Sequence, residues 1–97
     1  MVRRRQQVRP VEWLSRGSWP HGSLTSDAPP EARVARAITI ELDAAMQGRS
    51  PRSVAADAKL AHTTVYDLLK GKTYGDVITI ARLEAALQRS LWPTTTG

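Results

Sequence analysis

Apolar residues recur at every third or fourth position from about residue 29 to residue 91 of the chain. This spacing places apolar side chains on one face of a helix, whereas a half-buried strand would require strict alternation. It predicts four helices, over residues 29–47, 50–58, 62–70 and 76–89. We expect a single hydrophobic core from these helices, made by Ile38, Leu42, Val54, Val65, Leu69, Ile80, Leu83 and Leu87 and closed by Leu91.

The residues at the ends of these segments agree with the predicted helices. Ser50 is a favourable N-cap, because its hydroxyl can accept a hydrogen bond from the first helical turn. Asp76 is an equivalent cap for the last helix, whose apolar stripe is expected to begin at Val77. Gly48 and Gly71 follow the first and third segments, as helix-ending glycines do.

Residues 1–28 lack this helical spacing and mix Arg, Trp, Gly, Pro and Ser. Residues 8–14 have partial strand character, and residues 16–18 can turn the chain back toward Trp19. This extension is therefore predicted to be irregular or to contain a two-stranded hairpin, which would be marginal alone. Trp13 and Trp19 would be buried only by docking on the helices or on another subunit. The chain thus divides into an N-terminal extension (1–28), a helical domain (29–91) and a frayed C-terminal end (92–97).

The net charge of +5 resides mostly in the extension, while the helical domain is close to neutral. Residues 1–24 carry one acidic side chain, Glu12, against Arg3, Arg4, Arg5, Arg9 and Arg16. A basic surplus of this kind suits a nucleic acid or another anionic surface. The first four of these arginines are a candidate arm for the DNA minor groove, and the alternative is a solvated, disordered tail.

Several classes of protein are disfavoured by the composition. The chain has no cysteine, which excludes a disulfide framework and a thiolate metal site. No apolar run approaches the roughly 20 residues of a membrane span, and none follows the basic N-terminus as in a secretory signal. His21 and His62 are the only histidines, and no Ser-His-Asp or paired-carboxylate pattern stands out. We expect a cytoplasmic protein with no metal, no cofactor and no enzymatic activity.

Two of the predicted helices are short, and only residues 59–61 separate them. Two short helices joined by such a turn form a helix-turn-helix, whose second helix can enter the DNA major groove. The second helix of the lambda-repressor-like (Xre, Cro/C1-type) family is similar to residues 50–58, SPRSVAADA. The family's recognition helix, with the glycine that ends it, resembles residues 63–72, TTVYDLLKGK, and its next helix resembles residues 76–87, DVITIARLEAAL. The resemblance implies an all-α fold, a compact four-helix helix-turn-helix domain, to which the irregular or hairpin-bearing extension is added.

Four positions depart from the family's pattern. Lys59 stands where the family usually has a turn glycine, and Ala61 stands where Ser or Thr usually caps the recognition helix. Pro51 replaces a glutamine common at the start of the second helix, which removes one expected DNA contact. Pro93 leaves little room for the family's fifth helix. None of these changes interrupts the apolar pattern of the core.

The outward face of segment 62–70 is the candidate reading surface for DNA. Its large apolar residues Val65, Leu68 and Leu69 are expected to face the core, which turns the polar residues outward. We expect contacts to base edges from His62, Thr63, Tyr66 and Asp67.

Basic side chains flank this candidate surface. Contacts to phosphate position a protein on DNA without reading its sequence. We expect such contacts from Arg49, Arg52, Thr64, Lys70 and Lys72. Asp67 lies among these cations and either accepts a hydrogen bond from cytosine or pairs with Lys70 or Arg52. Pairing is the preferred interpretation, because charge pairs along a helix surface are common.

The expected function is transcriptional regulation by sequence-specific binding to double-stranded DNA, in the cytoplasm and in association with the nucleoid. A single small module buries little surface on DNA, which favours a homodimer on a palindromic operator. The absence of a recognisable ligand or catalytic domain favours a repressor that blocks access. The alternative is a protein-interaction module, or an antitoxin, whose N-terminal extension binds a partner protein.

Overall fold

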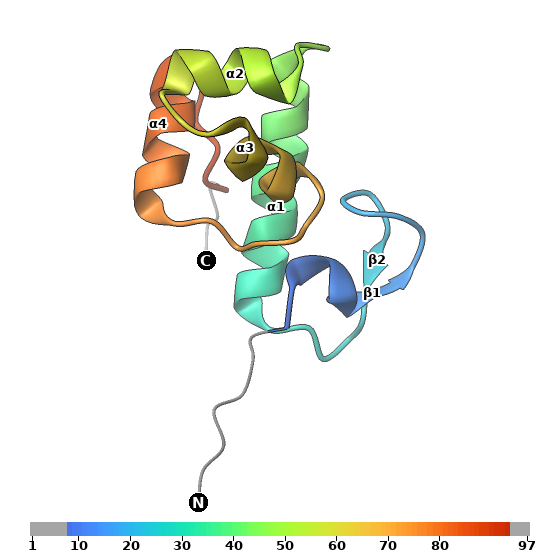
Figure 1. The fold of residues 1–97 in the computed structure, drawn as a ribbon. Helices are drawn as coiled ribbons and strands as arrows, with labels where there is room; N and C mark the ends of the chain where they lie inside the picture. The colour runs from blue at the N-terminus through green and yellow to red at the C-terminus, as the bar shows by residue number, and fades with distance from the viewer. Residues whose placement is uncertain (1–7, 94–97) are drawn as a thin grey trace, which may run out of the picture.

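The computed structural model describes residues 8–93 of the 97-residue chain. Between these residues the protein is mostly helical, with four α-helices and one small antiparallel sheet (Figure 1). The four predicted helices are confirmed to within about two residues at each end, as α1 (Pro30–Met46), α2 (Pro51–Ala58), α3 (His62–Leu69) and α4 (Val77–Leu87). The expectation of an all-α fold holds only broadly, because the extension adds two short strands.

Two of the helices begin at the predicted capping residues. The Ser50 hydroxyl oxygen accepts a hydrogen bond from the Ser53 backbone N–H at 3.1 Å. An Asp76 carboxylate oxygen accepts one from the Thr79 N–H at 2.7 Å. Helix α1 ends slightly before the predicted glycine, because Gln47 already adopts the left-handed conformation (φ 51°) before Gly48.

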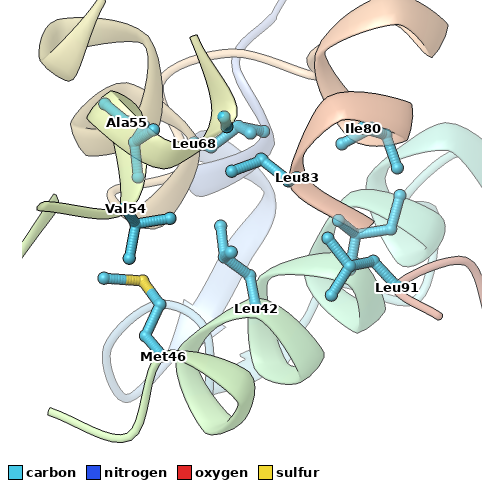
Figure 2. Close-up of a cluster of buried hydrophobic side chains, with 11 residues drawn as sticks. Leu42, Met46, Val54, Ala55, Leu68, Ile80, Leu83 and Leu91 are labelled. Carbon is cyan, nitrogen blue, oxygen red and sulfur yellow. The ribbon is translucent and has the colours of Figure 1, made fainter. Parts of the chain in front are cut away.

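The core lies where the four helices and the segment after α4 meet (Figure 2). It is built from Ile38, Leu42, Met46, Val54, Ala55, Ala58, Val65, Leu68, Ile80, Leu83 and Leu91. Leu91 is fully buried, and its backbone N–H donates to a Glu84 carboxylate oxygen at 2.7 Å, so the predicted closure of the core is confirmed. Leu69 and Leu87, expected inside, are half-buried at the edge of this core.

The first turn of α4 corrects the predicted apolar stripe. Val77 and Ile78 have exposed fractions of 69% and 64%, whereas Thr79 and Ile80 are buried. Residues two positions apart on a helix point in nearly opposite directions, so an inward Thr79 turns Val77 outward. The helix therefore packs through Ile80 and Leu83.

The extension forms a short 3-10 helix, η1 (Pro10–Trp13), followed by a two-stranded hairpin. Strands β1 (Leu14–Arg16) and β2 (Ser23–Leu24) pair antiparallel, so the extension contains a hairpin, one of the two predicted alternatives. The strand character predicted for residues 8–14 is wrong for residues 10–13, which form η1. Figure 1 shows the hairpin beside α1, on the side away from α4.

Several contacts dock the extension on the helical domain. The Val11 N–H donates to the Gly71 carbonyl at 3.0 Å, and the Tyr74 hydroxyl donates to the Val8 carbonyl at 2.6 Å. The Arg36 Nε donates to the carbonyl of Gly22 at 3.1 Å. The Trp19 ring lies against Gly71, where an added Cβ would come within 2.8 Å of the ring. The tryptophan docks on the helices of its own chain, which was one of the two predicted alternatives.

In the part of the chain that the structure describes, no helix combines the length and the apolar character that a membrane crossing requires.

Candidate nucleic-acid interface

The connection between α2 and α3 is short and tightly hydrogen-bonded. Lys59 adopts the left-handed conformation (φ 60°, ψ 46°), a region that glycine adopts without strain. The Lys59 and Leu60 N–H groups donate to the carbonyls of Ala56 and Ala55 at 3.3 and 2.9 Å. Leu60 also packs against the core. The turn is therefore closed with a lysine at this position.

Helix α3 presents one face to the core and the opposite face to solvent. Val65 and Leu68 are buried, while His62, Thr63 and Tyr66 are exposed. The exposed fraction of Tyr66 is 44%, which is high for so large a side chain. We call these three exposed residues the reading face. The structure places them together as the sequence predicts, with Thr64 and Asp67 half-buried at the margins.

Two lysines surround the ring of Tyr66. The Lys70 and Lys72 ammonium nitrogens each lie 5.5 Å from the centre of this ring. This distance is within the range of a cation–π interaction. Lys72 reaches the ring because the chain reverses at Gly71, which has a φ of +73°. Two candidate phosphate contacts thus stand beside a candidate base contact.

The preferred interpretation of Asp67 was wrong. Among residues 8–93 the ion pairs are Arg49 with Asp57, at 2.6 Å, and Arg89 with Glu41, at 3.0 Å. Asp67 is in neither of these pairs, and the Lys70 ammonium lies over the Tyr66 ring instead. The other alternative for Asp67, acceptance of a hydrogen bond from cytosine, stays a prediction.

The candidate phosphate contacts before and within α2 differ in their surroundings. The Arg49 guanidinium binds the Asp57 carboxylate and also donates to the Ser53 hydroxyl at 2.8 Å. Its charge is therefore largely offset within the chain. Arg52 lies on the first turn of α2 and is exposed. Of the two arginines, Arg52 is the better placed for an external phosphate.

The candidate minor-groove arm is described only in part. Arg3, Arg4 and Arg5 lie outside the described residues. Arg9 is exposed, and its backbone N–H donates to a Glu12 carboxylate oxygen at 3.2 Å.

A cleft of about 400 Å³ lies between the hairpin, α1, the start of α2 and α3. Trp19 and His21 of the hairpin line it together with Asp43 of α1. Tyr66 and Lys70 line the same cleft from the α3 side. No local sequence pattern places His21 near the reading face, because this proximity depends on how the extension docks.

Comparison of the chain with protein-family models, with curated proteins and with solved structures gave no match.

Proposed function

We propose that this chain is a sequence-specific DNA-binding regulator in which α2 and α3 act as a helix-turn-helix. The observation that carries the proposal is the reading face of α3, a polar surface on a helix whose other side is held in the core. An α-helix with its side chains is about 10–12 Å in diameter, and the major groove of DNA is about 12 Å wide. Helix α3 is therefore of a size to lie in that groove.

Each residue of the proposed interface has a chemical role. Thr63 can contact a thymine methyl, and Tyr66 and His62 carry polar atoms that can bind base edges. Lys70 and Lys72 bind phosphates beside the groove and fix the position of the helix. Both ammonium groups lie beside the Tyr66 ring, so the phosphate contacts and the base contact are adjacent on the surface.

In this proposal two copies of the chain form a homodimer, which binds a palindromic operator and represses transcription by blocking access to the DNA. The regulator acts in the cytoplasm, in association with the nucleoid. A module of this size buries little surface on DNA, and a second copy doubles the contacts. The docking of Trp19 on Gly71 favours this proposal over a partner-binding extension. A tryptophan held on its own chain is less available to a partner protein than one on a free extension.

The test is a set of paired titrations at fixed salt, with a duplex selected from a random pool and with mixed-sequence duplex DNA. Thr63→Ala and Tyr66→Ala should each reduce discrimination between the two by about 1–3 kcal/mol. Lys70→Ala should weaken binding to both duplexes alike and lower the salt slope by about one. Circular dichroism of each variant checks that the fold is kept.

The proposal fails if wild-type protein binds neither duplex. It also fails if the Thr63 and Tyr66 variants leave the ratio of the two affinities unchanged, because α3 would then not be the reading helix.

A further inference from the structure

We propose that the hairpin loop, residues 17–22, is a second DNA-contacting element, which meets the phosphate backbone beside α3. The inference rests on the proposed function and adds a contact surface to it. The hairpin belongs to the extension and lies outside the helix-turn-helix.

The loop stands next to the reading face. His21 is exposed and lines the same cleft as Tyr66 and Lys70. A helix lying in the major groove has a phosphate strand along each side of it. A loop beside the exposed face of α3 therefore projects toward one of these strands.

The position of the loop is set by contacts to the end of α3. The Trp19 ring covers Gly71, the second residue after that helix, and the Val11 N–H binds the Gly71 carbonyl at 3.0 Å. On the other side, Arg36 of α1 donates to the carbonyl of Gly22. Because these contacts hold the loop against both the end of α3 and α1, the loop is brought to the DNA together with α3.

The chemistry of the loop suits phosphate. From residue 13 to residue 26 the ionisable side chains are Arg16 and His21, with no acidic residue among them. Both are exposed, as is the hydroxyl-bearing Ser18. Basic and hydroxyl side chains are common donors to phosphate oxygens.

The acidic group near the loop limits where the DNA can lie. Asp43 of α1 lines the same cleft as His21, and its carboxylate repels a phosphate. The phosphate strand is therefore expected beside the exposed side chains of His21 and Lys70, and not inside the cleft.

The test places a negative or a positive side chain at position 21 and measures binding to mixed-sequence duplex DNA, so that no operator need be known. His21→Glu should weaken binding about three- to tenfold, and His21→Lys should tighten it and steepen the salt dependence by about one phosphate contact. Both variants should leave discrimination between selected and mixed duplexes unchanged, since phosphate contacts carry no sequence information.

Ser90→Glu is the matched control. Ser90 is exposed and follows the end of α4, whereas the hairpin lies on the side of α1 away from α4 (Figure 1). This variant introduces the same negative side chain as His21→Glu, and it should change affinity by less than about twofold at physiological salt. The thermal midpoints of all three variants should match that of the wild type, since both positions are exposed.

The outcomes separate the two proposals. If wild-type protein binds no DNA, both fall. Suppose instead that the wild type binds DNA and that the Thr63 and Tyr66 variants lose discrimination. If the two His21 variants then have the same affinity as each other, or the same affinity as Ser90→Glu, only the hairpin-loop contact is overturned.

Discussion

At the scale of single residues, Lys59 forms the turn between α2 and α3 in a strained backbone conformation. Lys59 adopts a backbone conformation that costs a residue other than glycine roughly 1–2 kcal/mol. The Arg82 guanidinium donates to the Lys59 carbonyl at 3.2 Å, and the neighbouring Leu60 packs on the core. Tertiary contacts therefore maintain a turn that the local sequence does not favour.

Asp76 provides a prediction about pH. The hydrogen bond from the Thr79 backbone N–H to its carboxylate lowers the pKa of Asp76 below its ordinary value. A lowered pKa means that the stabilisation is present above the ordinary pKa and is lost as the pH falls through the lowered one. Asp76→Asn keeps a capping oxygen but cannot titrate. Urea midpoints of both proteins should be measured from about pH 7 to about pH 3. The greater stability of the wild type relative to the variant should be lost below about pH 4. A difference that does not change with pH would contradict this account.

At the scale of elements, α4 is the clearest case of a helix with two unlike faces. Leu83 is fully buried in the core, whereas Ile78 of the same helix has an exposed fraction of 64%. Leu83→Ala should lower the free energy of unfolding by about 2–5 kcal/mol, because it leaves a cavity. Ile78→Ala should cost less than about 0.5 kcal/mol, because the side chain already lies in water. Chemical denaturation of both variants checks the prediction, and similar losses would mean that α4 is rotated from the orientation described.

At the scale of the whole molecule, the extension and the helices meet at Gly71. Gly71→Ala introduces a Cβ within 2.8 Å of the Trp19 ring at a position with a φ of +73°. Gly48 is the matched control, because it has a similar φ of +81° but nothing within 4 Å of an added Cβ. Gly48→Ala should lower the free energy of unfolding by about 1 kcal/mol from backbone strain alone, and Gly71→Ala should lower it by about 2–4 kcal/mol. Equal losses in denaturation experiments would show that Trp19 does not press on Gly71.

The local features of this protein could be read from its sequence. The four helices follow from apolar spacing, and Ser50 and Asp76 cap helices as their side chains predict. The separation of Val65 from His62, Thr63 and Tyr66 on the two faces of α3 follows from helical periodicity. These features depend on residues within one or two turns of each other, so a single segment contains the information.

Other features were decided only by the tertiary structure. Apolar spacing did not show that Leu69 and Leu87 lie at the edge of the core. The spacing of charged residues did not show that Asp67 forms no ion pair with Lys70 or Arg52. The contacts of the extension join residues far apart in the chain, such as Tyr74 with Val8. No local pattern specifies such pairs, because their geometry depends on how the helices are packed. The position of His21 beside the reading face is therefore a property of the fold, whereas the reading face itself follows from the sequence of α3.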